Sequence, residues 1–147
     1  MNVLFVSVTA FVLHLVWEML HLPLYRGYEE LNTLLPLPLW AALGDVFYTL
    51  LAFALVSLFK RSGLRWIAQA RMSDFVGLAV LGFLIAALVE YKALALGRWE
   101  YAAAMPIVPL LRVGLSPIAQ MTALLPFSVY LGALLLCVTQ AMRRRLL

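Results

Sequence analysis

The chain has very little charge: only 12% of its 147 residues are Asp, Glu, Lys or Arg, whereas 65% are hydrophobic. A soluble domain of ordinary composition carries about 25% charged residues, so the composition excludes a domain of that kind. Cys137 is the single cysteine, which excludes an intrachain disulfide and a metal site built from several cysteines. The sequence also contains no Walker or dinucleotide-binding fingerprint.

Four long apolar runs make up most of the chain. They comprise residues 3–24, 37–59, 75–97 and 117–142, and each is as long as the roughly 20 apolar residues that a helix needs to cross a bilayer. The first run has no basic segment before it and no clear cleavage site, so we interpret it as a helix and not as a signal peptide. The sequence therefore predicts an all-α membrane protein, a single domain over residues 1–147 folded as a four-transmembrane-helix bundle.

The basic residues indicate how the chain is oriented in the membrane. The connector between the second and third runs and the end of the chain hold Lys60, Arg61, Arg65, Arg71, Arg143, Arg144 and Arg145. The other two connectors hold only Arg26, Arg98 and Arg112. Because Lys and Arg favour the cytoplasmic side, we expect both termini in the cytoplasm of a bacterium, with the protein integral to its inner (plasma) membrane. The net charge of +4 then reflects contacts with anionic membrane lipid and not a nucleic-acid surface.

Three carboxylates lie inside the apolar runs. Glu18, Asp45 and Glu90 each fall on the order of 10 Å below the non-cytoplasmic surface, counted at ~1.5 Å per residue. An ionisable side chain within hydrocarbon costs at least ~2.5–3.5 kcal/mol on insertion scales. Three of them at a similar depth on separate segments therefore predict one functional site near that face.

Two histidines share a helix face with the first of these carboxylates. His14, Glu18 and His21 follow helical spacing, so one face of the first helix presents all three. Imidazole and carboxylate groups on one face can meet a single divalent metal ion, and no other cofactor is indicated. The structural alternative is that His14 hydrogen-bonds a neighbouring helix and His21 lies at the membrane interface.

The connector over residues 98–116 is too apolar for a solvated loop. Trp99 and Tyr101 suit the headgroup belt, and Pro106 and Pro109 oppose a regular helix. We expect the connector to form a re-entrant or interfacial lid over the carboxylates, which is tolerated where protein or water satisfies the backbone.

Two small residues in the third run are interpreted as helix-packing residues and not as site residues. Gly77 and Gly82 are expected to let a neighbouring helix approach closely. Ser116 and Pro117 suit the start of the fourth helix, with the serine as its cap.

The segment from Glu90 onward resembles the integral-membrane lycopene cyclase domain. That family has an acidic residue, a Trp-x-Tyr element about nine residues later, and a glycine-containing connector before a helix that starts Pro-Ile-Glu-Glu. Here Trp99 and Tyr101 follow Glu90, and Pro117 begins the last element, but Ala119 and Gln120 replace the paired glutamates. If those glutamates supply the acid in the family, other carboxylates must supply it in this chain.

A second, local resemblance is to the emopamil-binding sterol isomerases. His14-Leu-Val-Trp-Glu18 is similar to a His-x-x-x-Glu element of that group, and Gly44-Asp45 to a Gly-Asp pair. Both resemblances imply a small helical membrane protein that cyclises or isomerises an isoprenoid.

The residues and the resemblances together predict acid catalysis on an isoprenoid or other hydrophobic lipid. Such chemistry needs a protonated carboxyl group, which Glu18, Asp45 or Glu90 would supply with His14 as proton partner, and aromatic faces that stabilise a carbocation. The expected substrate-binding residues are Trp17, Tyr48, Trp99, Tyr101, Arg98 and Gln120.

Two other functions use the same residues. One is a small membrane transporter or channel subunit for protons or a divalent cation, which would need a homo-oligomer or a partner membrane subunit. The other is a non-catalytic lipid-binding or assembly subunit, in which the polar layer only holds the helices together.

Overall fold

A computed structural model of the chain describes residues 2–27, 36–60, 66–67 and 70–145. Its elements are α1 (Asn2–His21), η1 (Leu22–Leu24), α2 (Pro36–Phe59), α3 (Met72–Ala95), β1 (Ile107–Val108), β2 (Val113–Gly114) and α4 (Leu115–Arg145). Four of these helices are long and apolar enough to cross a membrane. The predicted number of spans is therefore confirmed.

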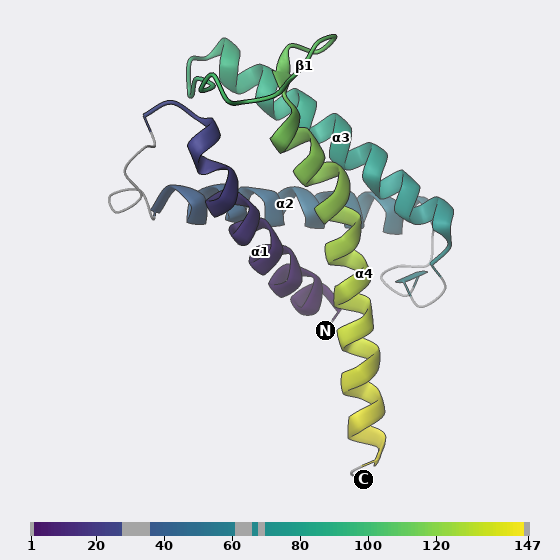
Figure 1. The fold of residues 1–147 in the computed structure, drawn as a ribbon. Helices are drawn as coiled ribbons and strands as arrows, with labels where there is room; N and C mark the ends of the chain where they lie inside the picture. The colour runs from purple at the N-terminus through teal and green to yellow at the C-terminus, as the bar shows by residue number, and fades with distance from the viewer. Residues whose placement is uncertain (1, 28–35, 61–65, 68–69, 146–147) are drawn as a thin grey trace.

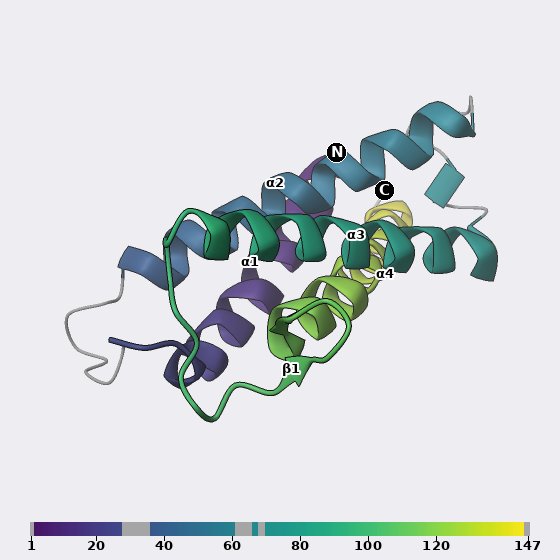
Figure 2. The same cartoon turned by 90° about the horizontal axis from the view of Figure 1, so that it is seen from above.

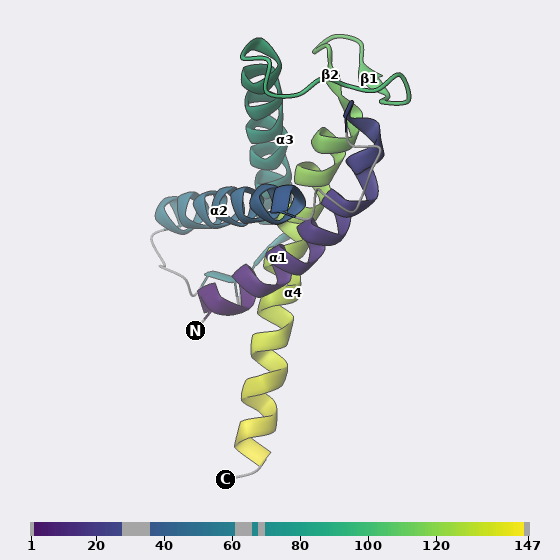
Figure 3. The ribbon, with the colours of Figure 1, turned by 90° about the vertical axis from the view of Figure 1, so that its left-hand side faces the viewer.

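The helices do not all run side by side (Figure 1). α1 and α3 both pack along α4, whereas α2 crosses α4 steeply (Figures 1 and 3). The prediction of four long apolar helices is confirmed, and within their arrangement α2 packs against α1 and α3 while it crosses α4. Both termini lie on the side of the molecule opposite the β1–β2 hairpin (Figures 1 and 3). Arg61 and Arg65, which supported the predicted orientation, lie outside the described residues.

α3 is displaced along the sequence from its predicted range. It begins at Met72, three residues early, because the Asp74 carboxylate accepts a hydrogen bond from the Arg71 backbone N–H at 2.8 Å and so satisfies a free donor at the helix start. It ends at Ala95, two residues early, because Gly97 adopts a left-handed φ of 61°. Both shifts come from end-of-helix hydrogen bonding and backbone conformation.

The ends of α1 and α4 also differ from their predicted positions. α1 stops at His21, and the predicted last turn is the tighter 3-10 helix Leu22–Leu24. α4 begins at Leu115 and continues to Arg145, longer than the predicted run at both ends. Ser116 therefore lies inside the first turn of α4 and is not its cap.

Two glycines set how closely α4 approaches its neighbours. A Cβ atom on Gly82 would lie 2.3 Å from the Met121 carbonyl oxygen of α4, and one on Gly132 would lie 2.9 Å from the Cα of Val6 in α1. The expected close approach is confirmed for Gly82. It is wrong for Gly77, where an added Cβ would meet nothing within 4 Å.

The connector between α3 and α4 forms a short hairpin tied to the end of α1 (Figures 2 and 3). β1 and β2 pair antiparallel. Nearer α3, the Arg26 N–H donates to the Glu100 carbonyl and the Ala102 N–H donates to the Leu24 carbonyl, both at 2.9 Å. The connector thus folds back over the ends of the helices, while its position relative to a bilayer stays a prediction.

Candidate functional site

A partly enclosed cavity of about 530 Å³ lies between the C-terminal end of α1, the N-terminal half of α2, the C-terminal half of α3 and the start of α4. Glu18, Asp45 and Glu90 all contribute to its wall. Most of the remaining wall is apolar or aromatic, with Leu22, Leu37, Trp40, Ile85 and Val89 among its residues. The three carboxylates that the sequence placed at one depth therefore surround one cavity.

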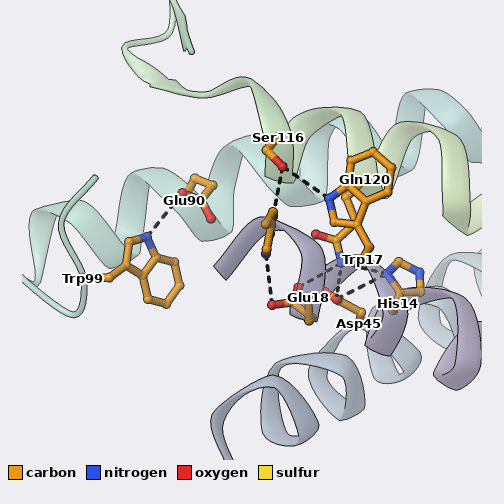
Figure 4. Close-up of polar contacts among 9 residues, drawn as sticks. His14, Trp17, Glu18, Asp45, Glu90, Trp99, Ser116 and Gln120 are labelled. Atoms are coloured by element: carbon orange, nitrogen blue, oxygen red, sulfur yellow. Dashed lines mark hydrogen bonds and ion pairs between the residues drawn. The ribbon is translucent and has the colours of Figure 1, made fainter. Parts of the chain in front are cut away.

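The Gln120 side chain links two of these carboxylates (Figure 4). Its Nε2 atom lies 2.9 Å from Glu18 Oε1 and 2.9 Å from Asp45 Oδ2. Those two carboxyl oxygens are therefore no further apart than twice this distance. A glutamate at this position would add a third acid and remove both amide donors, which gives a physical reason for the amide here.

His14 supports Asp45 from the interior of the protein. Its ring is completely buried, and its Nδ1 atom lies 3.2 Å from Asp45 Oδ2. Gln120 Nε2 is also 3.2 Å from His14 Nδ1, but it already donates to Glu18 and Asp45. The consistent arrangement is a His14 Nδ1–H that donates to Asp45. The predicted partnership between His14 and a neighbouring helix is thus found.

His21 extends the same polar network toward α4. Its Nε2 atom lies 3.1 Å from Glu18 Oε2 and its Nδ1 atom lies 2.9 Å from Ser116 Oγ. The Trp17 indole N–H also donates to Ser116, at 3.3 Å. A continuous series of polar contacts therefore runs from His14 to Ser116 (Figure 4). From the sequence, Ser116 is predicted only as a helix cap, since nothing local distinguishes a capping serine from a serine in a site.

Glu90 has a separate set of donors. The Trp99 indole N–H donates to Glu90 Oε2 at 3.3 Å, and the Tyr101 hydroxyl donates to the same oxygen. The Gly114 backbone N–H in turn donates to the Tyr101 oxygen at 2.9 Å. Burial, followed by the hydrogen bond to Glu90, raises the pKa of Tyr101 above its ordinary value, so this phenol remains a donor.

Tyr25 also lines the cavity, beside Trp99. Its ring contacts those of His21, Trp99 and Tyr101. Burial, followed by the negative charges of Glu90 and Glu18, raises the pKa of Tyr25 above its ordinary value. The cavity therefore has a protonated phenol beside its acids.

The predicted metal ligands do not converge. Glu18 contacts His21, but the nearest carboxylate to His14 is Asp45. Within the part of the chain that the structure describes, no group of three or more His, Cys, Asp or Glu side chains could hold a metal ion. His14 therefore pairs with Asp45 and His21 pairs with Glu18, and the Gln120 amide connects the two pairs.

The structure divides the predicted substrate-binding residues into two groups. Cavity-lining members are Tyr48, Arg98, Trp99 and Gln120. Trp17 and Tyr101 lie outside the wall and act through Ser116 and Glu90. The cavity also includes Ala41 and Gly44, which sequence reasoning missed. Ala41 lies four residues before Asp45 on the same face of α2 and Gly44 immediately precedes Asp45, so closeness to this carboxylate along α2 was the available signal.

Comparisons with protein-family models, with characterised proteins and with solved structures give no match to this chain.

Proposed function

We propose that this chain is an integral membrane protein that takes an isoprenoid or related lipid into the cavity and acts on it by acid chemistry. The observation that supports the proposal most is the combination of Glu18, Asp45 and Glu90 in the wall of one cavity that is otherwise largely apolar and aromatic. Its volume of about 530 Å³ is within the roughly 300–1,000 Å³ usual for small-molecule sites. We further propose the bacterial plasma membrane, with both termini in the cytoplasm.

The proposed reaction begins with proton transfer to a carbon–carbon double bond. A proton from the Asp45 carboxyl adds to one carbon, the π electrons form the new C–H bond, and the other carbon becomes a carbocation. Tyr48 and Trp99 offer ring faces for cation–π attraction to that charge. Gln120 and His14 hold Asp45 in place from the protein side.

The reaction ends with proton transfer to a different carboxylate. Glu90 accepts a proton from a carbon next to the carbocation, and the electrons of the broken C–H bond form a double bond at a new position. If another double bond of the same chain attacks the carbocation first, a ring closes before the proton leaves. Return of the proton from Glu90 to Asp45 resets the site, and no oxidant or reductant is consumed.

Deuterium incorporation tests this proposal. Purified protein in lipid nanodiscs is incubated in deuterated water with a panel of unsaturated isoprenoids and sterols, and mass spectrometry measures deuterium bound to carbon. We expect incorporation with at least one compound, and a loss of about 100-fold or more in Asp45→Asn, because a general acid contributes about 10²–10⁴ in rate.

Glu100→Gln is the matched control. Glu100 is an exposed carboxylate outside the cavity that pairs with Arg26, and surface pairs of this kind contribute about 0–1 kcal/mol. This variant should retain full incorporation. Incorporation no greater than in empty nanodiscs for every compound would contradict the proposal.

A proton-transporting subunit is the second candidate, and the contacts from His14 through Glu18 and His21 to Ser116 favour it. Proton flux into vesicles that depends on Asp45, together with no deuterium incorporation, would support that function instead. An assembly subunit would show neither activity, and Asp45→Asn would then affect stability alone.

A further inference from the structure

The polar end of the cavity presents hydrogen-bond acceptors that lack donors. Asp45 and Glu90 each use one carboxyl oxygen, Oδ2 and Oε2, in their hydrogen bonds. Among the described residues other than Tyr25, no amide, imidazole, indole or hydroxyl group donates to Asp45 Oδ1, Glu90 Oε1 or Gln120 Oε1. Asp45, Glu90 and Gln120 all line the cavity, so their side chains border the space that a ligand would occupy. They come from α2, α3 and α4, which places them around the cavity and not along one helix.

The free oxygens define what a ligand must supply. An acceptor that leaves water without gaining a donor loses free energy on the order of 1–3 kcal/mol, and more when it is charged. A purely hydrocarbon ligand would leave all three oxygens without a donor. A ligand whose end carries O–H or N–H groups would satisfy them.

The other end of the cavity is open to the apolar surroundings of the helices. Trp40 and Leu37 belong to its wall, yet their side chains are 72% and 42% exposed on α2. Across the cavity, Ile85 and Val89 of α3 supply the opposing apolar wall. A ligand can therefore keep its polar end at the acids while its chain lies between α2 and α3.

The volume sets the length of chain that the cavity holds. A cavity of about 150 Å³ accommodates one benzene. On that scale the 530 Å³ here corresponds to on the order of twenty carbon atoms. A single isoprenoid chain is of this size, and a two-chain phospholipid is not.

The charge of the cavity argues against an anionic end group. Among the residues that the structure describes, Arg98 is the one Lys or Arg side chain in the wall, whereas Glu18, Asp45 and Glu90 are three acids there. A phosphate placed at these acids would meet like charge, which is destabilising. A neutral hydroxyl or a cationic ammonium meets acceptors instead.

We infer that the ligand is a single-chain amphiphile of about twenty carbons whose end group donates hydrogen bonds, either an alcohol or a primary amine. Its end group contacts Asp45, Glu90 and Gln120, and its chain leaves between α2 and α3. This inference rests on the proposed function and specifies the substrate class of the same cavity.

Binding of matched probes tests the inference. Geranylgeraniol, geranylgeranylamine, the methyl ether of geranylgeraniol, the corresponding C20 hydrocarbon and geranylgeranyl monophosphate are titrated into protein in nanodiscs, and tryptophan fluorescence reports binding. We expect the alcohol or the amine to bind at least tenfold more tightly than the ether and the hydrocarbon, since a hydrogen bond to a charged group is worth about that much. The tighter of the two identifies the end group.

Variants show whether the preference comes from the acceptors in the cavity. Asp45→Asn and Glu90→Gln should each reduce the preference over the ether at least threefold, and the surface variant Glu100→Gln should leave it unchanged. Equal binding of the alcohol, the amine, the ether and the hydrocarbon, or tightest binding of the monophosphate, would overturn the inference and leave the proposed function standing. If no C20 compound binds, the inference also fails, and the deuterium experiment then decides the proposed function separately.

Discussion

Replacing Gln120 by leucine is expected to lower the melting temperature of the protein by on the order of 10 °C. The substitution removes both amide hydrogen bonds, to Glu18 and to Asp45, without removing either acid. Each hydrogen bond to a charged group contributes about 1.5–3 kcal/mol, and each kcal/mol shifts the melting temperature of a domain of this size by about 2–4 °C. Gln120 is only 2% exposed, and leucine has no donor for either carboxylate.

The control for this prediction lies on the same helix. Gln140→Leu makes the same chemical change at an exposed position of α4, where no side-chain hydrogen bond joins it to the site. It should shift the melting temperature by less than about 2 °C, as surface substitutions do. Thermal unfolding of both variants in the same nanodiscs makes the comparison, and equal shifts would show that Gln120 is not the centre of a stabilising network.

Gly82→Ala is expected to destabilise the protein although alanine favours helices. The new methyl group would lie 2.3 Å from the Met121 carbonyl oxygen and 2.8 Å from the carbonyl carbon. These are backbone atoms, so α3 and α4 must move apart, and overpacking of this kind costs about 1–3 kcal/mol. Separation of these helices would also enlarge the cavity that both of them line.

Gly77→Ala separates this effect from helix propensity. Gly77 lies in α3 as well, but an added Cβ there would meet nothing within 4 Å. Alanine is favoured over glycine in a helix by about 0.8–1.0 kcal/mol, so Gly77→Ala should leave the melting temperature unchanged or raise it slightly. A melting temperature that falls equally in both variants would contradict the close contact between α3 and α4.

The four spans and the carboxylate cavity could be predicted because each follows from the composition of a single segment. Apolar run length gives the helices, and counting residues from the ends of the runs gives Glu18, Asp45 and Glu90 a common depth. The local helix ends were less predictable. The hydropathy pattern predicts the start of α3 at residue 75. The helix begins earlier because the Asp74 side chain accepts a hydrogen bond from the Arg71 N–H.

Contacts between segments could not be predicted in the same way. Gly77 and Gly82 have similar sequence surroundings, yet only Gly82 faces the backbone of α4. His14 turned toward Asp45 and not toward Glu18 on its own helix, which depends on the steep crossing of α2. No pattern within a single segment specifies that crossing angle.

The most direct test of the site is photolabelling with a geranylgeraniol analogue that carries a diazirine near the middle of its chain. After illumination in nanodiscs, peptide mass spectrometry locates the label. We predict labelling of residues 37–48 of α2 and 85–90 of α3, prevented by excess unlabelled geranylgeraniol. Labelling spread over the exposed apolar positions of α4, such as Leu134, Leu135 and Val138, and unaffected by the competitor, would show that the cavity does not hold the lipid and would contradict the account.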